Sequence, residues 1–194
     1  MSQRVLELFR RSVDAKMTVG EAMAPAIEAA ADVLVDTLLA EGKILVCGNG
    51  PSSALSQWFA ASLMDRYERE RPSLPAIWLG ANMASYTAIV SDVHHEEVYA
   101  KPIRALGAAG DALVVISSSG NSGNLVQAVG AAHERGLRVI ALTGRDGGHL
   151  APLQRDTDLM LCAELSSRAR IHEVHLLTLN CLCDLIDHKL FGLD

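Results

Sequence analysis

The sequence lacks both an excess of positive charge and any long apolar run. Its 194 residues carry 17 Lys and Arg against 23 Asp and Glu, which gives a formal net charge of −6. Such a chain is unsuited to an extended contact with a nucleic-acid backbone. Its apolar runs fall well short of the roughly 18–20 residues that span a bilayer, and its N-terminus shows no basic and apolar leader. We therefore expect a cytoplasmic protein that contacts neither nucleic acid nor membrane directly.

Charged residues of either sign are also scarce. They make up 21% of the chain, and the mean hydropathy of +0.20 is apolar for a soluble monomer. This composition predicts that some helix faces are buried between subunits. The length suits a single domain with a full core, and the chain contains no internal repeat or linker, so residues 1–194 are assigned to one domain.

The four cysteines form no metal or redox motif. Cys47 and Cys162 lie in apolar strand-like runs, and Cys181 and Cys183 are two positions apart on a helix, so they point to different faces. We expect buried free thiols and no metal or other cofactor.

The hydrophobic period alternates along the chain between helix and strand. Helices are expected at 3–18, about 21–41, 52–70, 84–90, 95–106, 122–135 and 168–190, and strands at 43–47, 76–79, 112–116, 138–142 and 159–162. Strands that alternate with helices of this length predict an α/β fold, in which a parallel sheet is covered on both faces.

A hydroxyl-rich turn follows the central apolar strand. Residues 117–122 read Ser-Ser-Ser-Gly-Asn-Ser and precede a helical pattern. Backbone N–H groups at a helix N-terminus attract anions, and small hydroxyls donate hydrogen bonds without crowding the ligand. The turn contains no lysine, so it is not a Walker-type nucleotide site. It is typical of a seat for the phosphate of a small metabolite, although a polar turn with a helix cap would show the same residues.

A second turn, 48–53, follows the first strand in the same way. It reads Gly-Asn-Gly-Pro-Ser-Ser and partly matches the dinucleotide-binding pattern, but no acidic residue ends the next strand to hold a ribose. A nicotinamide site is therefore not expected. Both turns lie at carboxyl ends of parallel strands, where open α/β sheets bind ligands. Together they favour a phosphosugar site.

Several longer strings resemble the sugar isomerase (SIS) domain, and in particular its phosphoheptose isomerase branch. They are Cys-Gly-Asn-Gly (47–50), Glu-Arg-Pro-Ser-Leu-Pro-Ala-Ile (70–77), Glu-Val-Tyr-Ala-Lys (97–101), Ile-Ser-Ser-Ser-Gly-Asn-Ser (116–122), Ala-Leu-Thr-Gly-Arg-Asp-Gly-Gly (141–148) and Asn-Cys-Leu-Cys-Asp-Leu-Ile-Asp (180–187). The resemblance implies a flavodoxin-like three-layer αβα sandwich over 42–194. N-terminal helices, residues 1–41, would pack in a homotetramer with ligand sites at subunit interfaces.

The resemblance also implies which residues hold a phosphosugar. The phosphate is assigned to Ser52, Ser117, Ser119 and Ser122, and the full candidate set is Asn49, Ser52, Asp92, Ser117, Ser118, Ser119, Asn121 and Ser122. The catalytic positions do not carry over. The family's acid–base and zinc-binding positions fall on Trp58, Ser62, His172 and Asn180, so no catalytic residue is assigned and zinc is expected only if the protein is an isomerase.

The Phe-Ala-Ala-Ser string (59–62) and the last helix resemble the DiaA branch of the family more closely. Its members bind the replication initiator DnaA, which favours a non-catalytic tetramer that binds DnaA and promotes initiation of chromosome replication. Leu190 and Phe191, beside the C-terminus, are the candidate partner-binding residues; the alternative is that Phe191 docks the end of its own helix. A phosphoheptose isomerase using His172 or His175, and a phosphosugar sensor, are the alternative functions.

A further cluster of titratable residues lies at 94–97, His-His-Glu-Glu. Adjacent residues at a helix start point in different directions, and acids are favourable there. We interpret this cluster as a solvated N-terminal turn and assign it no role in the site.

Overall fold

Five parallel strands form the centre of the molecule, a computed structural model that describes residues 2–192. The strands are β1 (Ile44–Gly48), β2 (Ala76–Trp78), β3 (Ala112–Ile116), β4 (Arg138–Gly144) and β5 (Leu159–Ala163), in the order β2-β1-β3-β4-β5. This is the flavodoxin-like strand order. In register, Gly48 pairs with Ile116 and Ile116 with Leu142, so these strands end at one edge of the sheet. The predicted α/β fold with a parallel sheet is confirmed.

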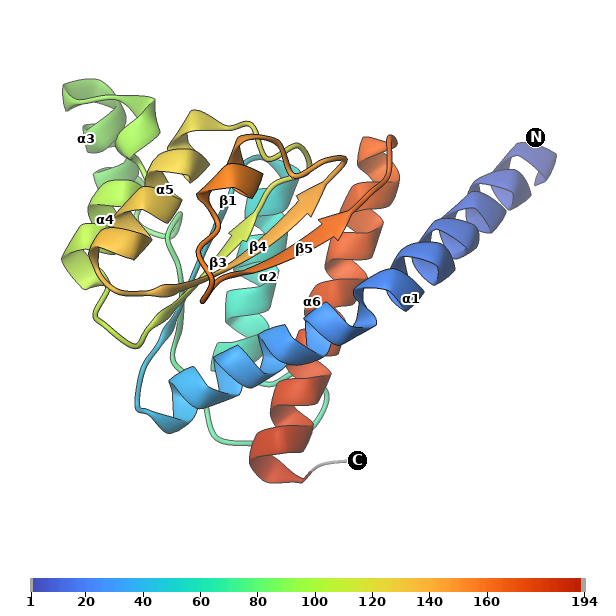
Figure 1. The fold of residues 1–194 in the computed structure, drawn as a ribbon, viewed down its shortest axis with the longest axis horizontal. Helices are drawn as coiled ribbons and strands as arrows, with labels where there is room; N and C mark the ends of the chain where they lie inside the picture. The colour runs from blue at the N-terminus through green and yellow to red at the C-terminus, as the bar shows by residue number, and fades with distance from the viewer. Residues whose placement is uncertain (1, 193–194) are drawn as a thin grey trace.

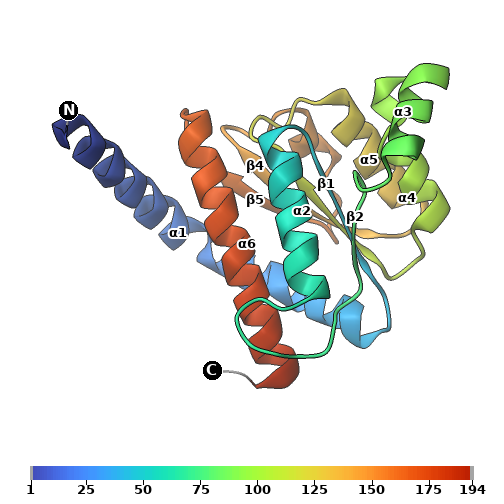
Figure 2. The same cartoon turned by 180° about the vertical axis from the view of Figure 1, so that it is seen from behind.

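Helices cover both faces of the sheet, as Figures 1 and 2 show from opposite sides. One face packs against α1 (Ser2–Leu39), α2 (Pro51–Met64) and α6 (Arg168–Phe191); the other packs against α4 (Ala100–Leu106) and α5 (Gly123–Glu134), with α3 (Met83–Asp92) beyond them. Side chains alternate along each strand: Val114 faces the first core and Val115 the second. Both strand faces are therefore apolar, which explains the continuous hydrophobic runs.

The N-terminal segment corrects our expectation of two helices. Residues Ser2–Leu39 form one continuous helix that passes through Gly20 and Pro25. A proline inside a helix removes one hydrogen bond and costs about 3 kcal/mol. Burial of Ala30, Ala31 and Leu34 against the rest of the protein offsets this cost. The beginning of the helix projects beyond the body of the molecule (Figure 1).

Two other helices differ from their expected bounds. The helix expected at 52–70 ends at Met64, because Arg71 donates hydrogen bonds to the carbonyls of Ser62 and Leu63 (2.8 Å each), which lie in its last turn. The helix expected at 95–106 divides into η1 (His95–Glu97) and α4. Pro102 lies in the first turn of α4, where a missing N–H is tolerated, so α4 begins at Ala100.

Beyond β4, the chain forms a short 3₁₀ helix, η2 (Gly148–Leu153). Among residues 2–192, no helix combines the length and the apolar character that a membrane crossing requires.

Candidate functional site

A cavity of about 280 Å³ lies at the carboxyl edge of the sheet. The turns after β1, β3 and β4 and the start of α6 contribute its walls. Six of the eight predicted phosphosugar residues line it: Asn49, Ser52, Ser117, Ser118, Ser119 and Ser122, together with Ile116, Leu125, Arg145 and Arg168. The parallel strands bring the two predicted turns, separated by more than 60 residues, to one place.

The serine turn is held in shape by its own side chains. Ser117 is 5% exposed, and its Oγ accepts a hydrogen bond from the backbone N–H of Gly120 at 3.0 Å. Gly120 has a φ of 68°, and a Cβ there would overlap the carbonyl of Gly147 in the turn after β4. Only glycine combines this backbone conformation with so close an approach. The turn therefore packs directly on its neighbour, and Ser122 becomes the N-cap residue of α5.

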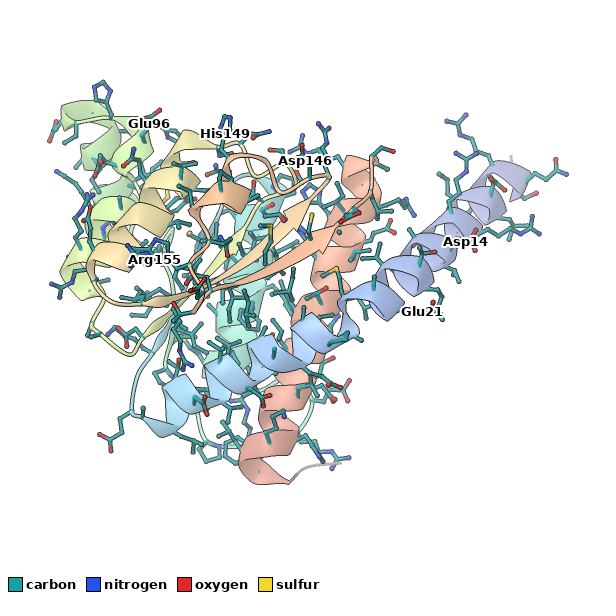
Figure 3. The ribbon with its side chains drawn as sticks, in the orientation of Figure 1. Asp14, Glu21, Glu96, Asp146, His149 and Arg155 are labelled. Atoms are coloured by element: carbon teal, nitrogen blue, oxygen red, sulfur yellow. The ribbon has the colours of Figure 1, made fainter. Side chains whose placement is uncertain are left out.

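Two predicted ligand residues lie outside the cavity wall. The Oδ1 atom of Asn121 accepts a hydrogen bond from the backbone N–H of His149 at 3.0 Å, so this side chain joins the serine turn to the segment after β4. Figure 3 shows His149 at this end of the molecule. Asp92 is the exposed last residue of α3. The assignment of Asn121 and Asp92 to a ligand stays a prediction.

Two arginines that the sequence reasoning missed also line the cavity. Arg145 follows β4 with a φ of 62°, and Arg168 is the first residue of α6. Their guanidinium groups carry permanent positive charge and present several N–H donors. The cavity thus combines two cations, serine hydroxyls and the N-terminus of α5, a set that favours a phosphate group. The turn after β4 could have revealed Arg145, because β4 ends at the same sheet edge as β3.

Asn49, the residue directly after β1, is held in place by a second asparagine. Its Nδ2 donates to Oδ1 of Asn124 at 2.8 Å, and Nδ2 of Asn124 donates back to Oδ1 of Asn49 at 2.9 Å. Asn124 lies in the first turn of α5 and is 2% exposed. This reciprocal pair links the β1 and β3 sides of the cavity.

The two histidines of α6 differ in environment. His175 is fully buried, its Nε2 donates to the carbonyl of Thr143 at 2.8 Å, and burial lowers its pKa to about 4. Its side chain has no exposed surface and its Nε2 is engaged by the backbone, so the geometry does not support the expectation that it replaces a catalytic residue. His172 is half-buried; burial and, secondarily, the charge of Arg168 lower its pKa.

The other positions that the family uses for catalysis carry no acid or base here. Trp58 packs edge-on against Tyr67, with ring centroids 6.4 Å apart, and Ser62 lies in the last turn of α2. Asn180 faces a separate apolar cavity between α1 and α6. Within residues 2–192, no three His, Cys, Asp or Glu side chains are grouped as metal ligands. Whether the protein binds zinc stays a prediction.

The candidate partner residues lie at the end of α6. Leu190 and Phe191 are half-buried and pack against the main core. Gly192 follows with a φ of 63° and caps the helix through its N–H to the carbonyl of His188 at 2.8 Å. These contacts support the interpretation that Phe191 docks the end of its own helix, while binding to a partner stays a prediction.

Comparison with known proteins gives close matches along nearly the whole chain. A phosphoheptose isomerase of Chromohalobacter salexigens is 51% identical over 189 residues, covering 97% of this chain and 96% of that protein. The DnaA initiator-associating protein DiaA of Cronobacter sakazakii is 51% identical over 191 residues, covering 98% and 97%. The solved phosphoheptose isomerase of Neisseria gonorrhoeae superposes with a TM-score of 0.91 at 43% identity, covering 96% of this chain and 98% of that one.

A family model described as the SIS domain matches residues 8–144. This match includes the strands β1 to β4 and the turns that follow β1 and β3. Together with the full-length relatives, it establishes that the chain belongs to the SIS domain family, in the group that contains the phosphoheptose isomerases and DiaA.

Proposed function

We propose that this protein binds a phosphorylated sugar in the cavity at the carboxyl edge of the sheet. The observation that carries this proposal is the convergence of five serines of the two turns with Arg145 and Arg168 on one small cavity. Serine hydroxyls and guanidinium groups match the acceptor oxygens of a phosphate. Asn49 lies at the same cavity and is suited to sugar hydroxyls.

The reaction we propose is the isomerisation of sedoheptulose 7-phosphate to D-glycero-D-manno-heptose 7-phosphate. The names of several full-length relatives support it. A ketose becomes an aldose in two steps. A base first removes a proton from C1 while the C2 carbonyl oxygen gains a proton. The C1 hydroxyl then loses its proton and C2 gains one. We propose His172 as the base, because it is half-buried one turn after the cavity residue Arg168, and burial together with the charge of Arg168 lowers its pKa.

Turnover of sedoheptulose 7-phosphate by the purified protein, with and without zinc, tests this proposal. We expect His172→Gln to lower kcat by about 100-fold or more, because a positioned base contributes roughly 10²–10⁴-fold. His94→Gln, a change at an exposed histidine, is the control and should leave kcat unchanged. A folded wild-type protein without turnover would contradict the isomerase.

The second candidate function is a non-catalytic tetramer that binds DnaA in the cytoplasm and promotes initiation of replication. One observation favours it: the described wall of the cavity contains no carboxylate and no imidazole. The 51% identical relative named DiaA supports it as well. A tetramer would offer several weak contacts at once and so gain affinity by avidity.

A pull-down of purified DnaA at micromolar concentration tests this candidate. We expect capture by the wild type and its loss in the Leu190→Ala/Phe191→Ala variant. Because both side chains also pack on the core, the melting temperature of the variant must be measured, and Lys189→Ala serves as a neighbouring surface control. Absence of capture by the wild type would rule the candidate out.

A further inference from the structure

The segment between α3 and α4 reaches the cavity through a chain of side-chain hydrogen bonds. Asn124 Nδ2 lies 3.2 Å from Nε2 of His95, the first residue of η1. Because an amide nitrogen can only donate, Nε2 of His95 accepts and the ring proton resides on Nδ1. The hydroxyl of Tyr86 lies 3.4 Å from that Nδ1. We call the series from His95 through Asn124 to Asn49 the amide relay.

The amide relay leaves Asn124 no freedom to turn. Its oxygen accepts from Asn49, one of its amide hydrogens returns to Asn49, and the other goes to His95. Rotation of this buried amide would break all three hydrogen bonds at once. Without His95, one buried N–H would lose its partner, and the direction of the reciprocal pair would no longer be determined.

A neighbouring contact holds η1 in place for this role. The carboxylate of Glu96 lies against Gly123, the first residue of α5, so closely that a Cβ at Gly123 would be 2.7 Å from its Oε1 atom. An acidic group is favourable at a helix N-terminus. Figure 3 shows Glu96 at the same end of the molecule as His149. Two successive residues of η1 therefore fix the segment to the start of α5.

The end of the amide relay that faces the cavity is suited to a hydroxyl. After its two hydrogen bonds with Asn124, Asn49 retains one amide N–H and one lone pair on Oδ1. A sugar hydroxyl both donates and accepts, so it can use both groups. A phosphate dianion only accepts, so it can use the N–H alone.

We propose that His95 is a positioning residue for the sugar: through Asn124 it holds the amide of Asn49 in the orientation that binds a hydroxyl of the phosphosugar. This inference rests on the proposed phosphosugar function. In this arrangement His95 affects only the binding of the sugar part of the ligand, through Asn49, while the serine turn and the arginines hold the phosphate.

Binding of two ligands, measured separately, tests the proposal. Sedoheptulose 7-phosphate is titrated by calorimetry and inorganic phosphate by phosphorus NMR, for the wild type and for His95→Leu, His95→Gln and His94→Gln. We expect His95→Leu to raise the Kd of the sugar phosphate about tenfold and to leave the Kd of inorganic phosphate within twofold. His95→Gln, whose Oε1 can accept from Asn124, should recover most of the affinity, and His94→Gln should match the wild type.

The outcomes separate the positioning role from a merely structural one. Equal weakening of both ligands by His95→Leu, or unchanged affinity for the sugar phosphate, would overturn the inference. A failure of His95→Gln to recover affinity would also count against the hydrogen bond to Asn124. If the wild type bound inorganic phosphate but no sugar phosphate, or bound neither ligand, the proposed function itself would fail, and the inference with it.

Discussion

The two arginines of the cavity are held by the backbone in different ways. Arg145 has a φ of 62°, which non-glycine residues rarely adopt. Arg168, in contrast, is the first helical residue of α6 and directly follows the N-cap residue Ser167. A strained backbone persists only where its surroundings determine it, and such positions often serve function. In this protein the strain at Arg145 coincides with a charge placed at the cavity.

Removing either arginine should weaken phosphosugar binding. We expect Arg145→Ala and Arg168→Ala each to raise the Kd of sedoheptulose 7-phosphate about tenfold or more, because hydrogen bonds to charged groups contribute about 1.5–3 kcal/mol. Alanine retains a Cβ, so it leaves the backbone strain at position 145 in place. Arg155→Ala, at an exposed arginine outside the cavity (Figure 3), is the control in the same calorimetric titration. Unchanged affinity in both variants would place the ligand elsewhere.

His175 should make the stability of the protein depend on pH. Its folded-state pKa is about 4, below the ordinary value of 6.5. Between these values the unfolded chain binds a proton that the folded chain does not, so stability falls as the pH falls through this window. From pH 7.5 to pH 5 the loss due to this residue is about 2 kcal/mol. Urea unfolding at the two pH values should show a smaller loss in His175→Gln; an equal loss would contradict the assignment.

At the scale of the elements, a buried ion pair connects α2, α6 and the segment before β2. Arg71 Nε lies 2.7 Å from Oδ1 of Asp187, and both side chains are almost completely buried. The same guanidinium group donates to carbonyls in the last turn of α2. Arg71 thus ends one helix and holds another, which explains why α2 stops before the expected residue.

Breaking this pair should be strongly destabilising. We expect Asp187→Ala to lower the free energy of unfolding by about 3–5 kcal/mol, because it leaves the Arg71 charge buried without a partner. Glu70→Ala breaks the exposed pair with Arg66 instead and should cost less than about 0.5 kcal/mol. Urea unfolding at one fixed protein concentration measures both variants. Similar losses in the two variants would show that burial of the pair does not matter.

For the whole molecule, the projecting part of α1 is the most unusual surface. Val5, Leu6, Phe9, Val13 and Met17 are each more than half exposed along it. A soluble chain seldom leaves such a row of large apolar side chains in water. The row accounts for part of the apolar composition noted in the sequence, and it fits the homotetramer that we propose.

Charge introduced on this row should prevent assembly. We expect Phe9→Asp/Val13→Asp to convert the tetramer into smaller species in sedimentation velocity, because it would bury carboxylates in an apolar contact. Asp14→Ala, on the same projecting segment (Figure 3), is the control and should remain assembled. A double variant with the sedimentation coefficient of the wild type would exclude this segment from the subunit contact.

The parallel α/β fold and the serine turn of the cavity follow from the sequence alone. Both are local: apolar runs indicate strands, and the residues that follow a strand form the turn at its end. Which distant residues join that turn depends instead on how the elements pack in three dimensions. Arg145 and Arg168 reach it because β4 lies beside β3 and α6 begins nearby, and His95 reaches Asn124 because η1 packs on α5. Such contacts depend on the strand order and on helix packing, which no short stretch of sequence encodes.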